Sequence, residues 1–218
     1  MQHTIALSLT LLVALAGCVS YTASPAPAPQ AESMPIWNTE GAVRVGVDPY
    51  TQPARQATIF GGDLSAVGII PIQVFVQNQE ERRLVIRPSD MMIELPDGSQ
   101  IISTGASTAA MKLERSHGAA VPATVFLGFA AAAVTASSED KARAARLQDY
   151  RRKELQDTQL RKGESAHGFV YFSLPAGTPA FTDATLIVRL VDFEEATSFA
   201  VRLPLRDVGF KGVPLKAE

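Results

Sequence analysis

Cysteine, histidine and excess charge are all scarce in this sequence. Its 218 residues include a single cysteine, Cys18, so no disulfide forms within the chain and no cysteine-rich zinc cluster is available. There are three histidines, and the formal net charge of −2 provides no basic field for nucleic acid. We therefore expect a domain that is stabilised by packing alone and that has no nucleic-acid partner.

Motifs that carry catalysis are also missing. No serine lies in a Gly-x-Ser-x-Gly pattern, and Gly61-Gly62 stands alone rather than within a glycine-rich phosphate loop. The acidic pairs Glu139-Asp140 and Glu194-Glu195 are adjacent in sequence, which is typical of a helix start and of a turn at the end of a strand. The chain is therefore not expected to be an enzyme, and no cofactor is implied.

A copper site is the one metal alternative. Met91, Met92, Met111, His117 and His167 are soft or borderline ligands that would hold copper if they converged. Consecutive strand residues point to opposite faces, so at most one of Met91 and Met92 would join such a site. No spacing supports it, and we expect core methionines and surface histidines instead.

An apolar run near the start of the chain is the first strong feature that is present. Residues Ile5 to Ala16 are apolar apart from Ser8 and Thr10. As a helix, this run covers about 18 Å of a bilayer core that is about 30 Å thick. It is too short to span the core, and its length is typical of the hydrophobic region of a secretory signal. The preceding Met1-Gln2-His3 lacks the usual Lys or Arg.

The run ends in Leu15-Ala16-Gly17-Cys18, which resembles the lipobox of bacterial lipoproteins. The resemblance implies that the signal is cut before Cys18, that the Cys18 thiol is diacylated and that the new amino group is acylated. Three chains would make attachment effectively permanent, because each buried CH₂ adds about 0.8 kcal/mol. By the family's sorting rule, Val19-Ser20 implies the periplasmic leaflet of an outer membrane. A buried N-terminal helix with an ordinary cysteine is the alternative.

A proline-rich segment follows the lipobox. Within Ser20 to Pro35, the run Ser24-Pro25-Ala26-Pro27-Ala28-Pro29 favours extended polyproline II, at about 3.1 Å per residue. No residue between Tyr21 and Met34 is predicted to join a core. We expect a signal at residues 1–17, a lipidated tether at 18–35 and one domain at 36–218.

From Gly41 onward, apolar residues recur with a period of two, which predicts strands. In the strand expected at residues 67–77, apolar side chains face both ways, so this strand should be central. Pro71 predicts a bulge or a strand start near Ile72. Pro96-Asp97-Gly98 predicts the turn of a hairpin. The other expected strands lie at residues 43–47, 55–60, 84–86, 91–95, 101–102, 165–174, 185–193 and 198–205.

Roughly eight strands with such turn signals predict a mainly β fold, an immunoglobulin-like antiparallel β-sandwich. Residues 71–78, 87–90, 96–98 and 163–172 resemble immunoglobulin-like domains in uncharacterised bacterial lipoproteins. That resemblance covers about half of the mature chain and implies a scaffold without a defined activity.

A helical insertion is expected at about residues 105–162. A short helical turn is predicted from Ser107 to Leu113, and an N-cap at Ser137-Ser138-Glu139-Asp140 is predicted to begin a helix that ends near Leu160. Leu147, Tyr150 and Leu155, with Ala144 nearby, give that helix a thin apolar face.

The uncharged stretch Ala119 to Ala136 has three interpretations. It is a helix packed on its own domain, a surface for membrane contact or helix association, or a membrane span. Association is indicated by small residues at every fourth position, which allow close helix packing. These residues are Ala120, Thr124, Gly128, Ala132 and Ala136.

The helix that follows is rich in basic residues, which lie among acidic ones. Such a helix near a membrane would touch anionic headgroups, whereas mixed charges favour a solvated, salt-bridged face. The basic residues are Arg143, Arg146, Arg151, Arg152 and Lys153.

These features together predict a membrane-anchored envelope lipoprotein that acts as a non-enzymatic interaction or assembly module. The helical insertion and one sheet edge are the expected contact surfaces, with an envelope protein or a second copy of the chain as partner. The alternative is a periplasmic carrier or chaperone for an apolar ligand such as lipid, motivated by the apolar run Val121 to Phe129. A metal binder is the third hypothesis.

Overall fold

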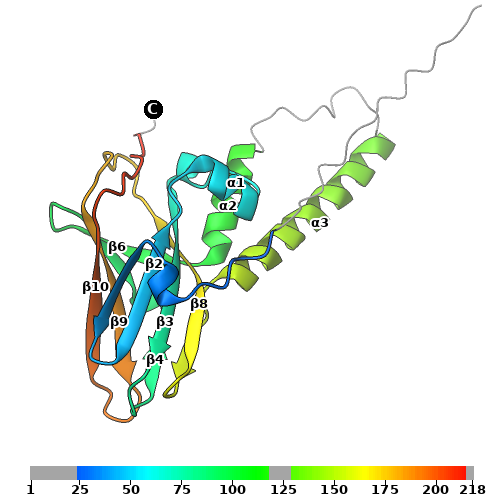
Figure 1. The fold of residues 1–218 in the computed structure, drawn as a ribbon. Coiled ribbons are helices and arrows are strands. Elements are labelled where there is room, and N and C mark those ends of the chain that lie inside the picture. The colour runs from blue at the N-terminus through cyan, green and yellow to red at the C-terminus, as the bar shows by residue number, and fades with distance from the viewer. Residues whose placement is uncertain (1–23, 118–128, 215–218) are drawn as a thin grey trace, which may run out of the picture.

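Two antiparallel sheets form the body of the protein (Figure 1). The computed structural model describes residues 24–117 and 129–214, and from His117 to Glu139 it describes no side chains. Sheet A has the order β1-β2-β3-β8-β6, and sheet B continues from β6 through β5 and β9 to β4 and β7, with β10 on the other side of β9. The strands are β1 (Ile36–Glu40), β2 (Val43–Pro49), β3 (Ile69–Asn78), β4 (Leu84–Ile86), β5 (Met92–Glu94), β6 (Gln100–Thr104), β7 (Thr158–Leu160), β8 (Ser165–Ser173), β9 (Ala184–Asp192) and β10 (Ser198–Leu205).

The two sheets are connected at both lateral edges of the sandwich. On one side, β6 pairs with β5 through Gln100–Ile102 and with β8 through Ser103 and Thr104. On the other side, the Asn38 side-chain amide of β1 donates to the Arg202 carbonyl of β10 at 3.0 Å. A mainly β sandwich with helices inserted after β6 was expected, and the structure confirms that fold class.

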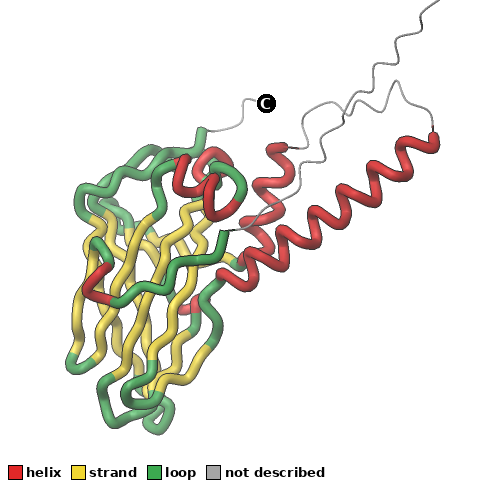
Figure 2. Tube along the Cα trace, turned by 45° about the vertical axis from the view of Figure 1, so that its right-hand side comes forward, coloured by secondary structure: helices red, strands yellow, loops and turns green. Residues whose placement is uncertain are grey.

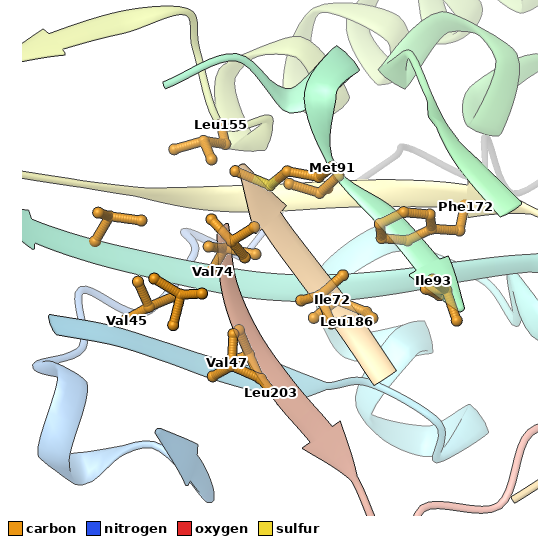
Figure 3. Close-up of a cluster of buried hydrophobic side chains, with 14 of the residues drawn as sticks. Val45, Val47, Ile72, Val74, Met91, Ile93, Leu155, Phe172, Leu186 and Leu203 are labelled. Atoms are coloured by element: carbon orange, nitrogen blue, oxygen red, sulfur yellow. The ribbon is translucent and has the colours of Figure 1, made fainter. Parts of the chain in front are cut away.

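The sandwich core lies between the sheets and follows the period-two pattern. Val45 and Val47 of β2, with Ile72 and Val74 of β3, are fully buried there. Figure 3 shows them opposite side chains of the second sheet, which include Leu186 and Leu203. Each such aliphatic side chain contributes about 1.5–3 kcal/mol when it is fully buried, so this layer is the main source of stability.

β3 is central, as expected, but it is not interrupted at Pro71. The strand runs unbroken from Ile69, and Pro71 pairs with Tyr171 of β8. The Pro71 carbonyl accepts from the Tyr50 amide at 3.0 Å, just past the end of β2. Because N–H and C=O of one strand residue point to the same side, the donor that proline lacks falls beyond the β2 ladder. The expected bulge or late start is therefore wrong.

In the described part of the chain, three α-helices lie against the outer face of sheet A at one end, which we call the helical end, and α3 reaches beyond it (Figures 1 and 2). They are α1 (Pro53–Phe60), α2 (Ala106–His117) and α3 (Phe129–Lys153). The predicted strand at residues 55–60 is wrong, because these residues form α1. Pro53 starts that helix, Gly61 ends it in a left-handed conformation, and Gln56 and Phe60 share its buried face.

The second half of the insertion also differs from expectation. α3 begins at Phe129 and continues through Ser137, so the predicted N-cap at Ser137–Asp140 is wrong. The helix ends at Lys153, and the predicted end near Leu160 is wrong, because residues 158–160 form β7 against β4. The chain leaves the helix where the Leu155 amide donates to the Phe169 carbonyl and the Leu155 side chain enters the sandwich core.

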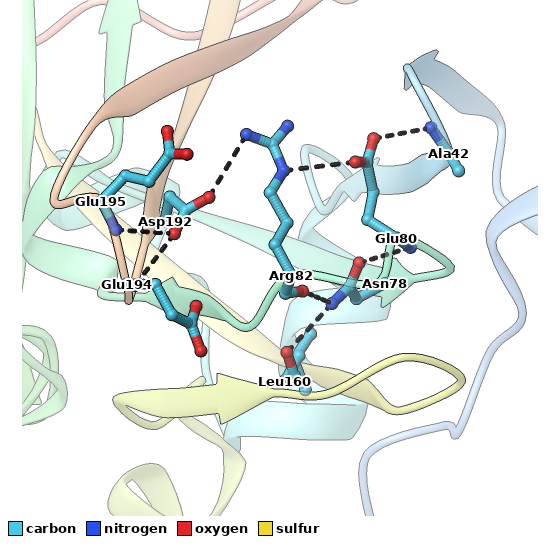
Figure 4. A network of polar contacts seen from close by, with 8 residues as sticks. All are labelled: Ala42, Asn78, Glu80, Arg82, Leu160, Asp192, Glu194 and Glu195. Atoms are coloured by element: carbon cyan, nitrogen blue, oxygen red, sulfur yellow. Dashed lines mark hydrogen bonds and ion pairs between the residues drawn. The ribbon is translucent and has the colours of Figure 1, made fainter.

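The opposite end of the sandwich, which we call the loop end, is organised by buried polar groups (Figure 4). The Asn78 amide donates to the carbonyls of Arg82 and Leu160, at 2.8 and 3.0 Å. The Asp192 carboxylate accepts from the Glu194 and Glu195 amides, at 2.9 and 3.1 Å. Glu194-Glu195 is thus a turn at a strand end, as the sequence indicates. Together with the nearby Arg82 guanidinium, these donors lower the pKa of Asp192.

Asp192 should make the fold sensitive to acid. A carboxylate with a lowered folded pKa stabilises the fold above its unfolded pKa, about 3.9, and loses that contribution as the pH falls through the folded value. Asp192→Asn should therefore lower the melting temperature at about pH 7 and make it fall less steeply toward about pH 3. Asp207→Asn, in an exposed turn after β10, is the control. An Asp192→Asn profile parallel to that of the unmodified protein would contradict this role.

Candidate functional site

The residues predicted to carry the anchor lie outside the described part of the chain. Leu15, Ala16, Gly17 and Cys18 all precede Ser24, where the description begins. Lipidation of Cys18 therefore stays a prediction. The residues that follow are described, and they determine where the anchor joins the domain.

Residues 26–34, the N-terminal strap, pack on the outer face of sheet A. Ala31 and Met34 are only 1% and 5% exposed, and they form a small cluster with Phe75. The strap lies so close to β2 that a Cβ on Gly46 would come within 2.8 Å of the Ala31 carbonyl oxygen. The expectation of a tether without core residues up to Pro35 is therefore wrong for this part of the chain.

Followed backward from Met34 to Ala26, the strap runs along the strands toward the helical end. Met34 and Ala31 lie over Gly46, and the Pro27 carbonyl accepts from the Gln73 side-chain amide at 2.8 Å. Gln73 pairs with Asp48, further along β2, and Ala26 then packs on the apolar cluster that contains Tyr50. The order Gly46, Asp48, Tyr50 fixes the direction of the strap, so Ser24 lies beside the helices.

A cluster of aromatic rings fills the space between the helices and sheet A. Phe60 of α1 lies 4.9 Å from Phe169 and 5.9 Å from Tyr171, both of β8, measured between ring centroids. Tyr50 lies 4.9 Å from Phe169, and Tyr150 of α3 stacks on Tyr171 at 5.9 Å. Such ring pairs contribute about 0.5–1.5 kcal/mol each beyond the area that they bury. The base of α3 is thereby fixed to the sheet.

Two polar groups lock the last turn of α3 to the end of α1. The Tyr150 hydroxyl donates to the Phe60 carbonyl at 3.1 Å, and burial raises the pKa of Tyr150. The Lys153 ammonium donates to the Ile59 carbonyl and pairs with Asp149 at 2.6 Å, although its residue is only 5% exposed. These donors satisfy carbonyls at the end of α1 that have no partner within that helix.

The other predicted residues of α3 are divided between core and surface. Tyr150 is buried and Leu147 packs on the aromatic cluster, as expected, but Ala144 is exposed. Arg143 and Arg146 pair with Glu114 of α2 at 3.1 and 3.8 Å. Arg151 and Arg152 are exposed. The ion pairs of Arg143 and Arg146 fit a salt-bridged face, but the expectation of a solvated face is wrong for Lys153, which is buried against the end of α1.

The small-residue stripe is only partly described. Ala120, Thr124 and Gly128 lie outside the described residues, while Ala132 and Ala136 belong to the backbone of α3. Most of the run Ala119 to Ala136, including most of Val121 to Phe129, is also outside. Within the described ranges, we find no helix with both the length and the apolar composition of a membrane span.

Several depressions adjoin the helices in the described part of the chain, and two of them bear on the predictions. A groove of about 190 Å³ between α2 and α3 is lined by Ala110, Met111 and Leu147, with the Glu114 ion pairs at its rim. A larger pocket, of about 470 Å³, lies between β6 and the chain that follows α3, beside Ile102, which is 69% exposed. Glu154 lines this pocket, and burial raises its pKa although the Ala106 amide donates to it at 2.7 Å.

The candidate copper ligands do not converge in the described structure. Met91 is buried in the sandwich core, Met111 is exposed on α2, and His167 lies on β8. The side chain of His117 lies outside the described part. In residues 24–117 and 129–214, no group of three His, Cys, Asp or Glu side chains is arranged to hold a metal ion.

Sequence reasoning missed the strap, Glu154 and the exposed Ile102. Gly46 was the available signal for the strap, because a glycine between Val45 and Val47 in a strand marks a close approach of another backbone. Glu154 caps the start of α2 from the end of α3, a pairing of distant residues that has no local sequence signal.

Comparisons with known proteins give only weak structural similarity. No family model matches the sequence, and no curated protein matches it. A provisionally assigned lipoprotein (ycdA) from Bacillus subtilis is similar to 78% of the chain, with a TM-score of 0.39 and 11% identity, and the chain spans 39% of that protein's length. A provisionally assigned ApaA protein from Bordetella pertussis is similar to 81% of the chain, with a TM-score of 0.33 and 14% identity. The similarity covers 94% of the ApaA chain. At this level of similarity, neither protein defines a family or a function for the chain.

Proposed function

We propose that the protein is a lipid-anchored lipoprotein of the bacterial envelope that acts as a non-enzymatic interaction module. The anchor rests on the lipobox-like Leu15-Ala16-Gly17-Cys18 and the short apolar run before it. Val19-Ser20 favours the periplasmic leaflet of the outer membrane. The domain itself provides a rigid scaffold.

The observation that carries the interaction role is the projection of α3. The helix has 25 residues, or about 37 Å at 1.5 Å per residue, and Figures 1 and 2 show its N-terminal part extending away from the sandwich. Its base is held by the aromatic cluster and by Lys153, so the projecting part has a fixed direction. Ala144, Ala145 and Gln148 are exposed on the same helix nearer to its base. A rigidly held, exposed helix is a suitable surface for an envelope protein that packs against it.

The expected sheet-edge surface has less support. The β1 edge is covered by β10 through the Asn38 contact, and β7 at the other end of the strand order has only three residues. Backbone pairing with a partner strand needs a free and reasonably long edge. The helices are therefore the preferred contact surface.

The carrier alternative also loses support from the structure. An apolar ligand held between the helices and sheet A would need a cavity there. The rings of Tyr50, Phe60, Tyr150, Phe169 and Tyr171 occupy that space in the described part of the chain, and all five are at most 3% exposed.

Anchoring is tested by Cys18→Ser. Without the thiol there is no site for diacylation, so the protein should move from the membrane fraction to the soluble fraction or keep its signal uncut. Sedimentation of the envelope and the mass of the mature chain measure both outcomes, with Ser20→Ala as the control. Unchanged sedimentation together with normal signal removal would refute the anchor.

The interaction role is tested by photo-cross-linking in living cells. A photoreactive phenylalanine analogue in place of Gln148, exposed on α3, should give one discrete adduct with an envelope protein. The same analogue in place of Glu195, in the exposed turn at the loop end, is the matched control and should give none. Equal labelling at both positions, or no adduct at Gln148, would exclude the exposed face of α3 around Gln148 as the contact surface.

A further inference from the structure

We infer that the N-terminal strap orients the domain on the membrane, with the helical end facing the bilayer and the loop end facing away. This inference rests on the proposed lipidation of Cys18 and adds a surface to it. The membrane is thereby the partner of a particular part of the domain, and the partner of α3 must lie close to that membrane.

The first step is the length of chain that remains free. A tether up to Pro35 would allow the domain to turn in any direction. Because the strap is packed on sheet A from residue 26, only the seven residues 19–25 separate Cys18 from the domain. The eight residue steps from Cys18 to Ala26 span at most about 29 Å when fully extended.

The second step is the place where this short connecting segment, which we call the leash, joins the domain. The N-terminal end of the strap lies beside the aromatic cluster, and both views show this end next to the base of α3. The loop end lies at the other end of the strands, where Asn78 and Asp192 hold the turns. β3 has ten residues and separates the two ends by about 33 Å. That separation exceeds the reach of the leash, so the helical end is held nearer to the bilayer.

The third step is the composition of the helix that projects from the same end. Residues 129–138, the first part of α3, contain no Asp, Glu, Lys or Arg. Bringing charged side chains out of water is costly, whereas an uncharged helical stretch carries no such cost at a headgroup layer. At the loop end, by contrast, Glu80, Glu81 and Glu194 are ion-paired with Arg82, Lys162 and Arg83, so that end presents charged side chains of both signs. Contact with a bilayer would require bringing these charges out of water.

The orientation depends on the contacts between the strap and sheet A, and a substitution can test them. Its contacts are the Ala31, Met34 and Phe75 cluster, the Gln73 hydrogen bond, and an ion pair between Glu32 and Arg44 at 3.0 Å. Gly46→Ala should displace the strap, because the added Cβ would lie 2.8 Å from the Ala31 carbonyl and 2.9 Å from the Met34 sulfur. Gly209→Ala is the matched control, since a Cβ there meets no atom within 4 Å.

The experiment measures energy transfer from one dye on the domain to acceptor-labelled lipids, with the full-length lipidated protein in phosphatidylethanolamine–phosphatidylglycerol vesicles. Cys18 is the only cysteine, and the proposed lipidation blocks its thiol, so an introduced cysteine is the only free thiol in the lipidated protein. Arg115→Cys places the dye on α2 at the helical end, and Glu195→Cys places it at the loop end. We expect transfer to be at least about twofold higher from Arg115→Cys, because the two ends differ by about one strand length.

Two variants separate orientation from mere attachment. Gly46→Ala should bring the two transfer values together, whereas Gly209→Ala should leave their difference unchanged. Inserting about twenty Gly and Ser residues between Val19 and Ser20 should also abolish the difference without touching the fold, because the fully extended reach of the leash grows to roughly 100 Å, well beyond the distance between the two ends. If Gly46→Ala does not fold, this insertion variant tests the orientation of the domain.

The outcomes distinguish this inference from the proposed anchor. A protein that does not sediment with the vesicles would refute the anchor. A protein that is bound but shows equal transfer from both ends, or a difference that survives the insertion, would overturn the orientation and leave the anchor intact.

Discussion

The structure depends on the burial of β3 and β8 on both faces. On one face, Ile72, Val74 and Val170 belong to the sandwich core, and on the other, Ile69, Phe169 and Tyr171 belong to the aromatic cluster under the helices. Without the helices and the strap, that second face would expose large apolar side chains to water, which soluble domains rarely tolerate over a wide area. The insertion and the N-terminal strap are therefore parts of the fold as well as candidate functional surfaces.

This constraint links the anchor to the rest of the molecule. A strap that covers Phe75 and meets the aromatic cluster cannot also act as a long, free tether. The position at which the chain leaves the domain is set by packing, because Gly46 leaves room for the Ala31 backbone and Gln73 binds the Pro27 carbonyl. If the protein is attached to a membrane as proposed, the strap orients the domain with its helical end toward the bilayer. The projecting helix then lies near the bilayer.

How far the sequence predicts the structure depends on how local each signal is. Alternation of apolar residues predicts β3, β8, β9 and β10, and Pro96-Asp97-Gly98 predicts the β5–β6 turn, where Gly98 has a φ of 83°. The predicted strand at residues 55–60 is wrong because α1 has too few apolar residues to show a helical period. The helix signals in this segment are Pro53 at its start and Gly61 after its end. The strap could not be predicted from composition, since Ala31 is buried only because β2 carries a glycine opposite it. Glu154 and the aromatic cluster depend on contacts between distant segments, which no local pattern encodes.

The most direct test of the account is amide hydrogen exchange across the strap in the lipidated protein. Met34 donates to the Ala31 carbonyl and Ser33 to the Gln30 carbonyl, both at 3.1 Å, on a segment that is packed against Phe75. If the strap is part of the fold, these amides should exchange about as slowly as those of the neighbouring strand β1 and should lose that protection in Gly46→Ala. Exchange at the rate of an unstructured peptide in the unmodified protein would contradict the account.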